Sequence, residues 1–124
     1  MSLRGTILVV DDDTALLTCL ELVLKLAGFR TITTTTGQSA LEKLAQGDVD
    51  VIVLDCCLPD TDGAKLVTTI KDKWPLVRVI LSSGYLQDED TPGVDAVLTK
   101  PFAPQDLVSM IGRLLPGAVA GTGT

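Results

Sequence analysis

The chain has 124 residues, 46% hydrophobic and 21% charged, with a net charge of −6. This length suits one domain with a single core, and the composition excludes a disordered chain. No apolar run approaches the ~20 residues that span a bilayer, and the scattered basic residues argue against nucleic-acid binding. We therefore expect one cytoplasmic domain that contacts neither membrane nor nucleic acid.

The cysteines agree with a reducing compartment. Cys19, Cys56 and Cys57 are an odd number, and the adjacent pair cannot form a disulfide without strain. We expect reduced thiols. The chain has no His, so a zinc site has no support.

Short apolar runs alternate with helical patterns along the whole chain. Runs rich in Val, Ile and Leu predict strands near Thr6–Val10, Arg30–Thr34, Val49–Leu54, Val77–Ser82 and Ala96–Thr99. Helices are expected near Asp13–Ala27, Gly37–Gln46, Gly63–Trp74 and Pro104–Leu115. This alternation predicts an α/β fold, a doubly wound parallel sheet with helices on both faces. Residues 1–115 form the expected domain, and the Gly-rich residues 116–124 are expected to be a flexible tail or linker.

Polar residues stand where the apolar runs end. Asp11 and Asp12 follow the first run, Asp55 the third, Ser83 the fourth and Lys100 the fifth. In an open parallel sheet, ligands bind beyond the carboxyl ends of the strands. We therefore expect these five side chains to meet at one edge of the sheet.

Each of these residues also has a purely structural explanation. One of the three consecutive acids could cap the first helix, Asp55 could be a solvated loop acid, and Ser83 could belong to a turn. Lys100 could be a surface lysine held extended by the following proline. A helix needs only one cap, however, and chance does not explain why all five residues fall at the same end of their strands.

The chemistry of this set indicates phosphoryl transfer. Three converging carboxylates repel one another unless a cation neutralises them, and oxygen ligands without His suit Mg²⁺ or Mn²⁺. Lys100 offers a positive charge to a phosphoryl oxygen, and Ser83 a hydroxyl donor. Asp55 is the natural nucleophile, because metal and lysine offset its charge.

The motifs VVDDD, VLDCCLPDTDG, SSGY and KPF resemble the receiver (phosphoacceptor) domain of two-component response regulators. The resemblance extends from Thr6 to about Leu115. It implies the flavodoxin-like three-layer fold with strand order 2-1-3-4-5.

The same resemblance implies a role for each matched residue. Asp55 is then the phosphorylated residue, and Asp11, Asp12 and Asp55 bind Mg²⁺ with the backbone carbonyl of Cys57. Ser83 is the switch hydroxyl. Lys100 binds the phosphoryl group before a cis peptide bond to Pro101.

The expected partner is a histidine kinase or histidine phosphotransfer domain, because a chain without His cannot supply the phosphohistidine donor itself. The domain is expected to be a monomer or weak dimer. It assists its own phosphorylation and dephosphorylation and is a signalling domain rather than an enzyme. Either a single-domain regulator or a receiver from a hybrid sensor kinase fits, and the wording of the motifs leans toward the hybrid kinase.

The sequence departs from the family pattern in two places. Val97 stands where many members carry an aromatic residue that rotates on activation. The stretch between Ser83 and Lys100 is about five residues shorter than usual, more than one helical turn. We expect phosphorylation to persist, whereas signalling through this region is in doubt.

A different class is the strongest alternative. ILVVDDDT also resembles the first motif of haloacid-dehalogenase-like phosphatases, which would make Asp11 the nucleophile and Asp13 the general acid. Such enzymes need a later acidic pair and usually a cap insertion, and Asp55 would have no role. A flavodoxin-like FMN carrier is weaker, because the three acids would repel a phosphate.

The first expected helix is apolar over more than one face. At 100° per residue, its core stripe is predicted to be Leu16, Leu20, Val23 and Ala27. Leu22 and Leu26 fall outside that stripe. They are either covered by a neighbouring helix or exposed for a partner.

Overall fold

Five parallel strands form one sheet in the order β2-β1-β3-β4-β5, as predicted. The computed structural model describes residues 4–84 and 91–115. The strands are β1 (Thr6–Val10), β2 (Arg30–Thr34), β3 (Val51–Asp55), β4 (Arg78–Ser83) and β5 (Ala96–Thr99). The helices are α1 (Thr14–Leu26), α2 (Gly37–Ala45), α3 (Gly63–Lys73) and α4 (Pro104–Leu114).

Two strands have boundaries that differ from the prediction, and the ends of both strands concern the site. β3 begins at Val51 rather than Val49 and includes Asp55, and β4 includes Ser83. Backbone pairing with the neighbouring strand continues for one residue beyond the apolar run, since Asp55 pairs with Ser82 and Ser83 with Thr99. Both polar residues are therefore held by the sheet itself rather than by a loop.

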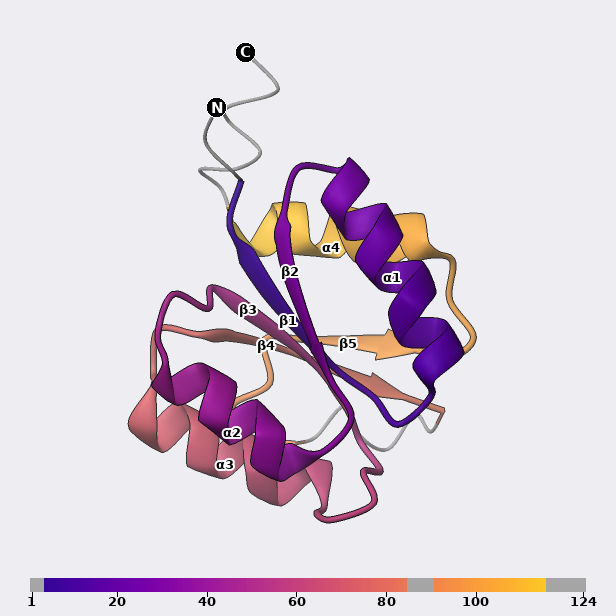
Figure 1. Cartoon of the computed structure of the whole chain (residues 1–124). Helices are drawn as coiled ribbons and strands as arrows, with labels where there is room; N and C mark the ends of the chain where they lie inside the picture. The colour runs from indigo at the N-terminus through magenta and orange to yellow at the C-terminus, as the bar shows by residue number, and fades with distance from the viewer. Residues whose placement is uncertain (1–3, 85–90, 116–124) are drawn as a thin grey trace.

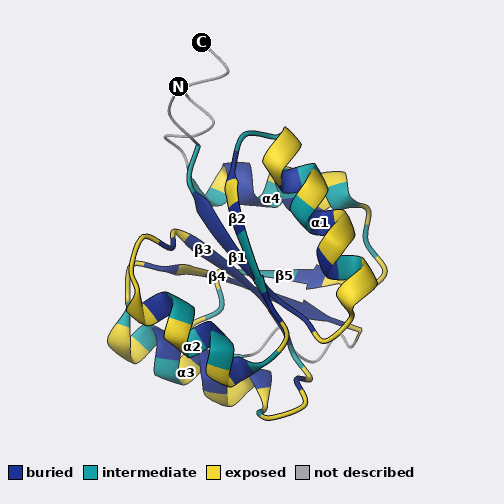
Figure 2. Ribbon diagram, viewed as in Figure 1, coloured by how far each residue is buried: buried dark blue, intermediate teal, exposed yellow. Residues whose placement is uncertain are grey.

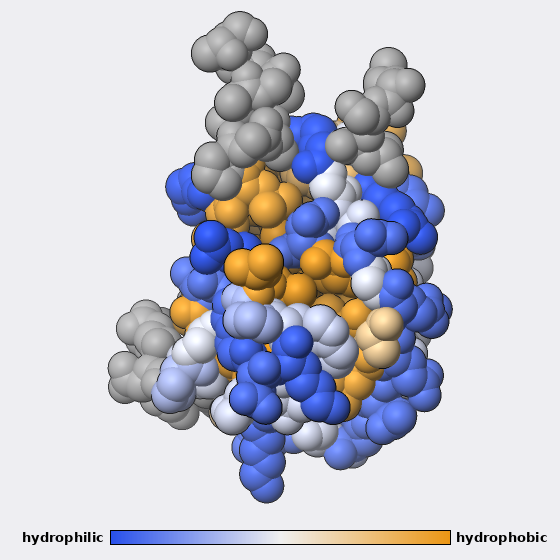
Figure 3. Space-filling model, turned by 90° about the vertical axis from the view of Figure 1, so that its left-hand side faces the viewer, coloured by the Kyte–Doolittle hydropathy of each residue, from blue (hydrophilic) through white to orange (hydrophobic). Residues whose placement is uncertain are grey.

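The sheet is covered on both faces. α2 and α3 lie together on one face, and α1 and α4 on the other (Figure 1). Every residue of β1 and β3 is buried, which explains why these runs are apolar without alternation (Figure 2). On the side of the molecule seen at the left of Figure 1, apolar side chains lie in a hollowed middle region between hydrophilic ones (Figure 3). None of the helices in residues 4–84 and 91–115 is both long and apolar enough to span a bilayer.

The buried stripe of α1 corrects the prediction. Leu17, Leu20 and Leu24 are buried, whereas Leu16 and Val23 are only half-buried. Because α1 carries leucines on adjacent faces, periodicity leaves two possible stripes, and packing between the sheet and α4 selects one of them.

The helix ends follow the local sequence signals. Asp13 caps α1 by accepting the Leu16 N–H at 3.1 Å, and Asp62 caps α3 by accepting the Ala64 N–H at 2.8 Å. Gly28 and Gly47 follow α1 and α2 with φ of 99° and 88°, a conformation that glycine adopts without strain.

Asp95 joins the region before β5 to the rest of the sheet. Its carboxylate accepts the Val79 N–H at 2.7 Å and the Lys71 ammonium at 2.9 Å, and Arg78 lies 3.6 Å away. Burial acts to raise the pKa of Asp95, but the Val79 N–H and the two cations outweigh it and hold the pKa below the usual 3.8.

We expect Asp95→Ala to lower the free energy of unfolding at pH 7 by about 1–3 kcal/mol, because the substitution leaves the Val79 N–H and Lys71 without their acceptor. Since the folded pKa is lowered, this stabilisation is present above the ordinary Asp pKa and is lost as the pH falls through the folded value. Urea unfolding of the parent and variant at neutral and acid pH measures both effects. Asp72→Ala, at an exposed position of α3, is the control, and equal losses in the two variants would contradict the assignment.

Candidate phosphoacceptor and metal site

The acids from β1 and β3 meet at the carboxyl edge of the sheet. Asp11 follows β1 and is 3% exposed, and Asp55 ends β3 and is 6% exposed. Asp12 is exposed beside them, and one carboxylate oxygen from each of the three acids lies within 4.8 Å of the others. The sheet order puts β1 next to β3, which explains this convergence.

Lys100 brings the compensating charge from β5. Its Nζ lies 2.9 Å from Asp11 Oδ2 and 3.5 Å from Asp55 Oδ1. Burial acts to lower the pKa of Lys100, but the two carboxylates outweigh it and raise that pKa, so the ammonium stays charged. The peptide bond from Lys100 to Pro101 is cis, as expected.

The surroundings of Asp55 raise the pKa of its carboxyl group above the usual 3.8. Burial, followed by the repulsion of Asp11, raises the pKa of Asp55, although Lys100 and the Cys57 N–H act in the opposite direction. The Cys57 N–H lies 3.4 Å from Asp55 Oδ1. One lysine does not neutralise the negative charge of three acids. A cation bound by their oxygen ligands would neutralise the remaining charge.

The donor set fits Mg²⁺. Three carboxylates supply hard oxygen ligands, and Asp12, being exposed, leaves the site open to the waters that Mg²⁺ usually keeps. Asp11 Oδ1 also accepts the Asp13 N–H at 2.9 Å, which fixes its orientation.

Ser83 lies at the same edge and is fully buried. Its carbonyl accepts the Lys100 N–H at 2.7 Å, so β4 and β5 hold the hydroxyl and the ammonium in register. The Ser83 side chain hydrogen-bonds the Cys56 thiol. Burial, followed by the hydrogen bond with Cys57, raises the pKa of the Cys56 thiol to about 12.

The loop after β3 is anchored at its far end. Asp60 accepts the N–H groups of Gly37 at 2.8 Å and Gln38 at 3.0 Å, and these bonds lower the pKa of Asp60. The N-terminus of α2 thereby holds the loop that carries Cys57. Asp60 is 23 positions after Gly37 and 22 positions after Gln38 in the sequence, so this contact is a tertiary one.

Two features of this edge were missed by sequence reasoning. Ser82 pairs directly with Asp55 across the two strands, and its buried Oγ has no hydrogen-bond partner among the described atoms. The only sequence signal for Ser82 was the pair of serines before Gly84. Two adjacent serines supply two hydroxyls, and the sequence alone does not indicate which hydroxyl faces the acids.

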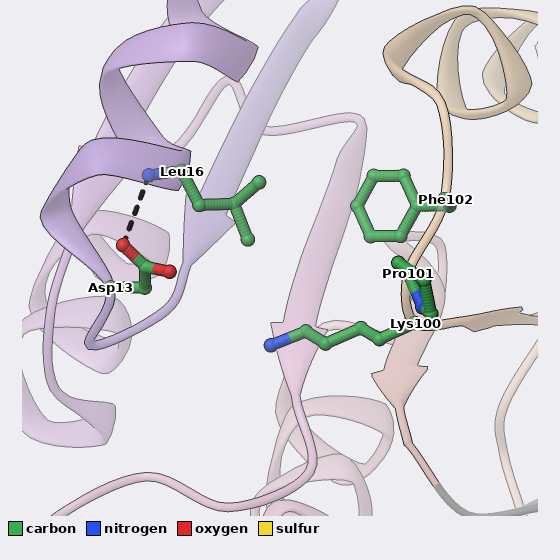
Figure 4. Close-up of a pocket in the computed structure, with 5 residues that line it drawn as sticks. All are labelled: Asp13, Leu16, Lys100, Pro101 and Phe102. Carbon is green, nitrogen blue, oxygen red and sulfur yellow. Dashed lines mark hydrogen bonds between the residues drawn. The ribbon is translucent and has the colours of Figure 1, made fainter.

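The second missed feature is a hollow of about 420 Å³ beside Lys100. Leu16 and Phe102 point toward each other across it, and Asp13 and Pro101 complete its lining (Figure 4). The apolar residues at the start of α1 and after the KP pair were its only sequence signal.

Comparison with known proteins agrees with this geometry. Residues 7–112 match the response regulator receiver domain family. The response regulator SaeR of Staphylococcus epidermidis is 32% identical over 114 residues, covering 88% of this chain and 49% of SaeR, and SaeR of Staphylococcus aureus is 31% identical. The chain therefore spans about half the length of the curated relatives it matches.

Solved structures share the fold over nearly the whole chain. A CheY-like receiver domain protein from Methanospirillum hungatei superposes with a TM-score of 0.88 at 30% identity, covering 97% of this chain and 99% of that one. The response regulator TrrA of Thermotoga maritima, solved in complex with Mg²⁺ and BeF, gives a TM-score of 0.82 at 27% identity over 90% of this chain and 99% of its own.

The phosphatase alternative loses its support at the same point. The Asp13 carboxylate, which would be the general acid, caps α1, and Asp55, which would have no role, is one of the three acids that meet and lies 3.5 Å from Lys100. The family match covers both the acid cluster and the lysine. The chain thus belongs to the response regulator receiver domain family and is a signalling phosphoacceptor of the two-component type.

Proposed function

We propose that Asp55 accepts a phosphoryl group from a phosphohistidine on a partner histidine kinase or phosphotransfer domain. Asp11, Asp12 and Asp55, with the backbone carbonyl of Cys57, would hold Mg²⁺ or Mn²⁺. Lys100 would bind the phosphoryl oxygens. The observation that carries the proposal is the meeting of three carboxylates within 4.8 Å of one another with the Lys100 ammonium 2.9 and 3.5 Å from two of them.

The transfer is a displacement at phosphorus. An Asp55 oxygen forms the new O–P bond while the N–P bond to the donor imidazole breaks, and that electron pair returns to the nitrogen. Bound Mg²⁺ would neutralise charge on the acids and on the phosphoryl oxygens. Lys100 orients the group, and because the transition state is loose, positioning and charge account for most of the catalysis.

Ser83 and Lys100 are the proposed switch. The new phosphoryl oxygens compete with Asp11 for the Lys100 ammonium and offer an acceptor to the Ser83 hydroxyl. The hydrogen bond between the Lys100 N–H and the Ser83 carbonyl joins the two responses. Val97 is half-buried in β5 and has no ring to follow the hydroxyl. The shortened stretch before β5 includes residues 85–90, which lie outside the described residues, as does the predicted tail at 116–124.

The direct test is phosphorylation by a small-molecule donor. Acetyl phosphate with Mg²⁺ is expected to add one phosphoryl group, measured as intact mass. Reduction of the acyl phosphate with borohydride and peptide mapping should place it at Asp55. A chain that stays unmodified with Mg²⁺ present, while a known receiver domain is labelled, would overturn the proposal.

The partner is proposed to dock along α1. Ala15, Cys19, Leu22 and Leu26 recur at helical spacing and are all exposed, Leu22 by 60% and Leu26 by 80%. This stripe begins at the end of α1 next to the site. A helix carrying the phosphohistidine would cover the stripe and bring its imidazole to the acids.

We expect Leu22→Glu to slow phosphotransfer from the partner by about tenfold or more, because a charge in the centre of an apolar contact is costly. Labelling by acetyl phosphate and the unfolding midpoint should not change, since Leu22 is exposed. Leu76→Glu is the matched control, because Leu76 is 91% exposed and precedes β4 at the opposite edge of the sheet. Equal transfer rates in the two variants would remove α1 from the docking surface.

A further inference from the structure

Two thiols lie side by side directly after the acceptor. Cys56 Sγ and Cys57 Sγ are 3.1 Å apart, and both cysteines are free. Cys57 is exposed and Cys56 is half-buried. The transfer chemistry at Asp55 needs only the backbone of Cys57, so neither thiol has a role in it.

The spacing disfavours a disulfide. Neighbouring Cα atoms across a trans peptide are about 3.8 Å apart, below the usual disulfide range of about 4.4–6.8 Å, and an S–S bond needs about 2.05 Å. A single soft atom can bind both sulfurs without bringing them closer together. Metal–thiolate bonds are about 2.3 Å long, and two such bonds that meet near a right angle place the sulfurs about 3.3 Å apart.

The backbone under the thiols is fixed. The Cys56 N–H donates to Ser82 at 2.9 Å, and the Cys56 carbonyl accepts the Gly63 N–H at 2.9 Å. Gly63 packs so closely that a Cβ there would lie 2.8 Å from the Cys56 Cα. The isolated bridge between Cys57 and Asp62 holds the next residue. The two sulfurs are thus preorganised on one side of a rigid turn, which lowers the entropic cost of binding.

We propose that Cys56 and Cys57 form a binding site for trivalent arsenic, either arsenite or an organic arsenoxide. Each sulfur forms one As–S bond as its S–H bond breaks. An arsenoxide loses its oxygen, which leaves with both thiol protons as one water, whereas arsenite loses two of its three hydroxyl groups, each leaving with one thiol proton as water. No oxidant or reductant is needed. In the described part of the chain, the metal-ligand cluster comprises the three acids and neither thiol, so a four-coordinate zinc site lacks its remaining ligands. Arsenic carrying one organic group needs only the two thiols.

A group held there would interfere with the acceptor. The Cys57 N–H contacts Asp55, and the Cys56 thiol contacts Ser83. This regulatory part rests on the proposed function: arsenic binding is expected to slow phosphorylation of Asp55 by crowding the Asp55 oxygen that attacks phosphorus and the Cys57 carbonyl assigned to the metal. The binding itself does not depend on phosphorylation.

The binding is tested with phenylarsine oxide. Intact mass should show one phenylarsenic group per chain with two hydrogens lost. It should survive excess 2-mercaptoethanol and be removed by the dithiol 2,3-dimercaptopropanol. Chelation by two linked thiols raises the affinity by about a hundredfold over one thiol. Cys56→Ser and Cys57→Ser should each therefore lose the adduct in monothiol, whereas Cys19→Ser should keep it.

The outcomes separate the two parts. If Cys57→Ser, at an exposed position, retains the adduct as the parent does, or if Cys19→Ser loses it, the site is overturned. If the arsenic-free chain is labelled by acetyl phosphate and the loaded chain is labelled at the same rate, the regulatory part is wrong. If the arsenic-free chain is never labelled, the failure lies in the proposed function, and the mass result still decides the thiol site.

Discussion

Asp55→Asn is expected to abolish phosphorylation by acetyl phosphate completely. The amide lacks the carboxylate oxygen that attacks phosphorus, and Asp55 lies within 4.8 Å of Asp11 and Asp12 and 3.5 Å from the Lys100 ammonium. Asp11→Asn should slow labelling without moving it, because it weakens the metal site and leaves the nucleophile. Intact mass against time, with saturating Mg²⁺, measures both rates.

The control for this series is Asp48→Asn. Asp48 is exposed in the loop before β3, at the far edge of the sheet, and its φ of 70° is one that asparagine tolerates. Its labelling should equal that of the parent. Labelling that persists in Asp55→Asn and disappears in Asp11→Asn would instead identify Asp11 as the nucleophile and revive the phosphatase hypothesis.

Mg²⁺ is expected to stabilise the folded chain, because the unfolded chain does not gather the three acids into one site. At ten times its dissociation constant, the ion adds about 1.4 kcal/mol to the free energy of unfolding. Asp12→Ala should remove most of this gain while leaving the fold intact, since Asp12 is exposed. Thermal unfolding with and without millimolar Mg²⁺ provides the measurement, and Ca²⁺ tests for a general charge effect.

Without metal, the site is expected to make the free energy of unfolding depend on pH. Burial and Asp11 raise the folded pKa of Asp55 above its unfolded value. The stabilisation that Asp55 contributes is therefore present below the unfolded pKa and is lost as the pH rises through the folded pKa. The Mg²⁺ gain should therefore be larger at neutral pH than in the acid range. A melting temperature that Mg²⁺ leaves unchanged at neutral pH would contradict the metal site.

The sequence by itself determined the strands and the residues of the site. β1 and β3 are buried on both faces, so their apolar runs had no other stable place in an α/β domain. Because all strands are parallel, a polar residue at the end of each run had to reach the same edge. Asp11, Asp55 and Lys100 were therefore predictable from position alone, and the motifs supplied their expected roles.

Only the tertiary structure decided which groups touch. The rotation of α1 that buries Leu17 and Leu24 depends on its packing against the sheet and α4, and a helix apolar on adjacent faces does not specify that rotation. Two features depend on strand register and on the turn that Gly63 closes: among the described atoms the Ser82 hydroxyl has no hydrogen-bond partner, and the thiols of Cys56 and Cys57 lie 3.1 Å apart. Periodicity reports the face of one element, whereas these contacts are set by how several elements pack at once.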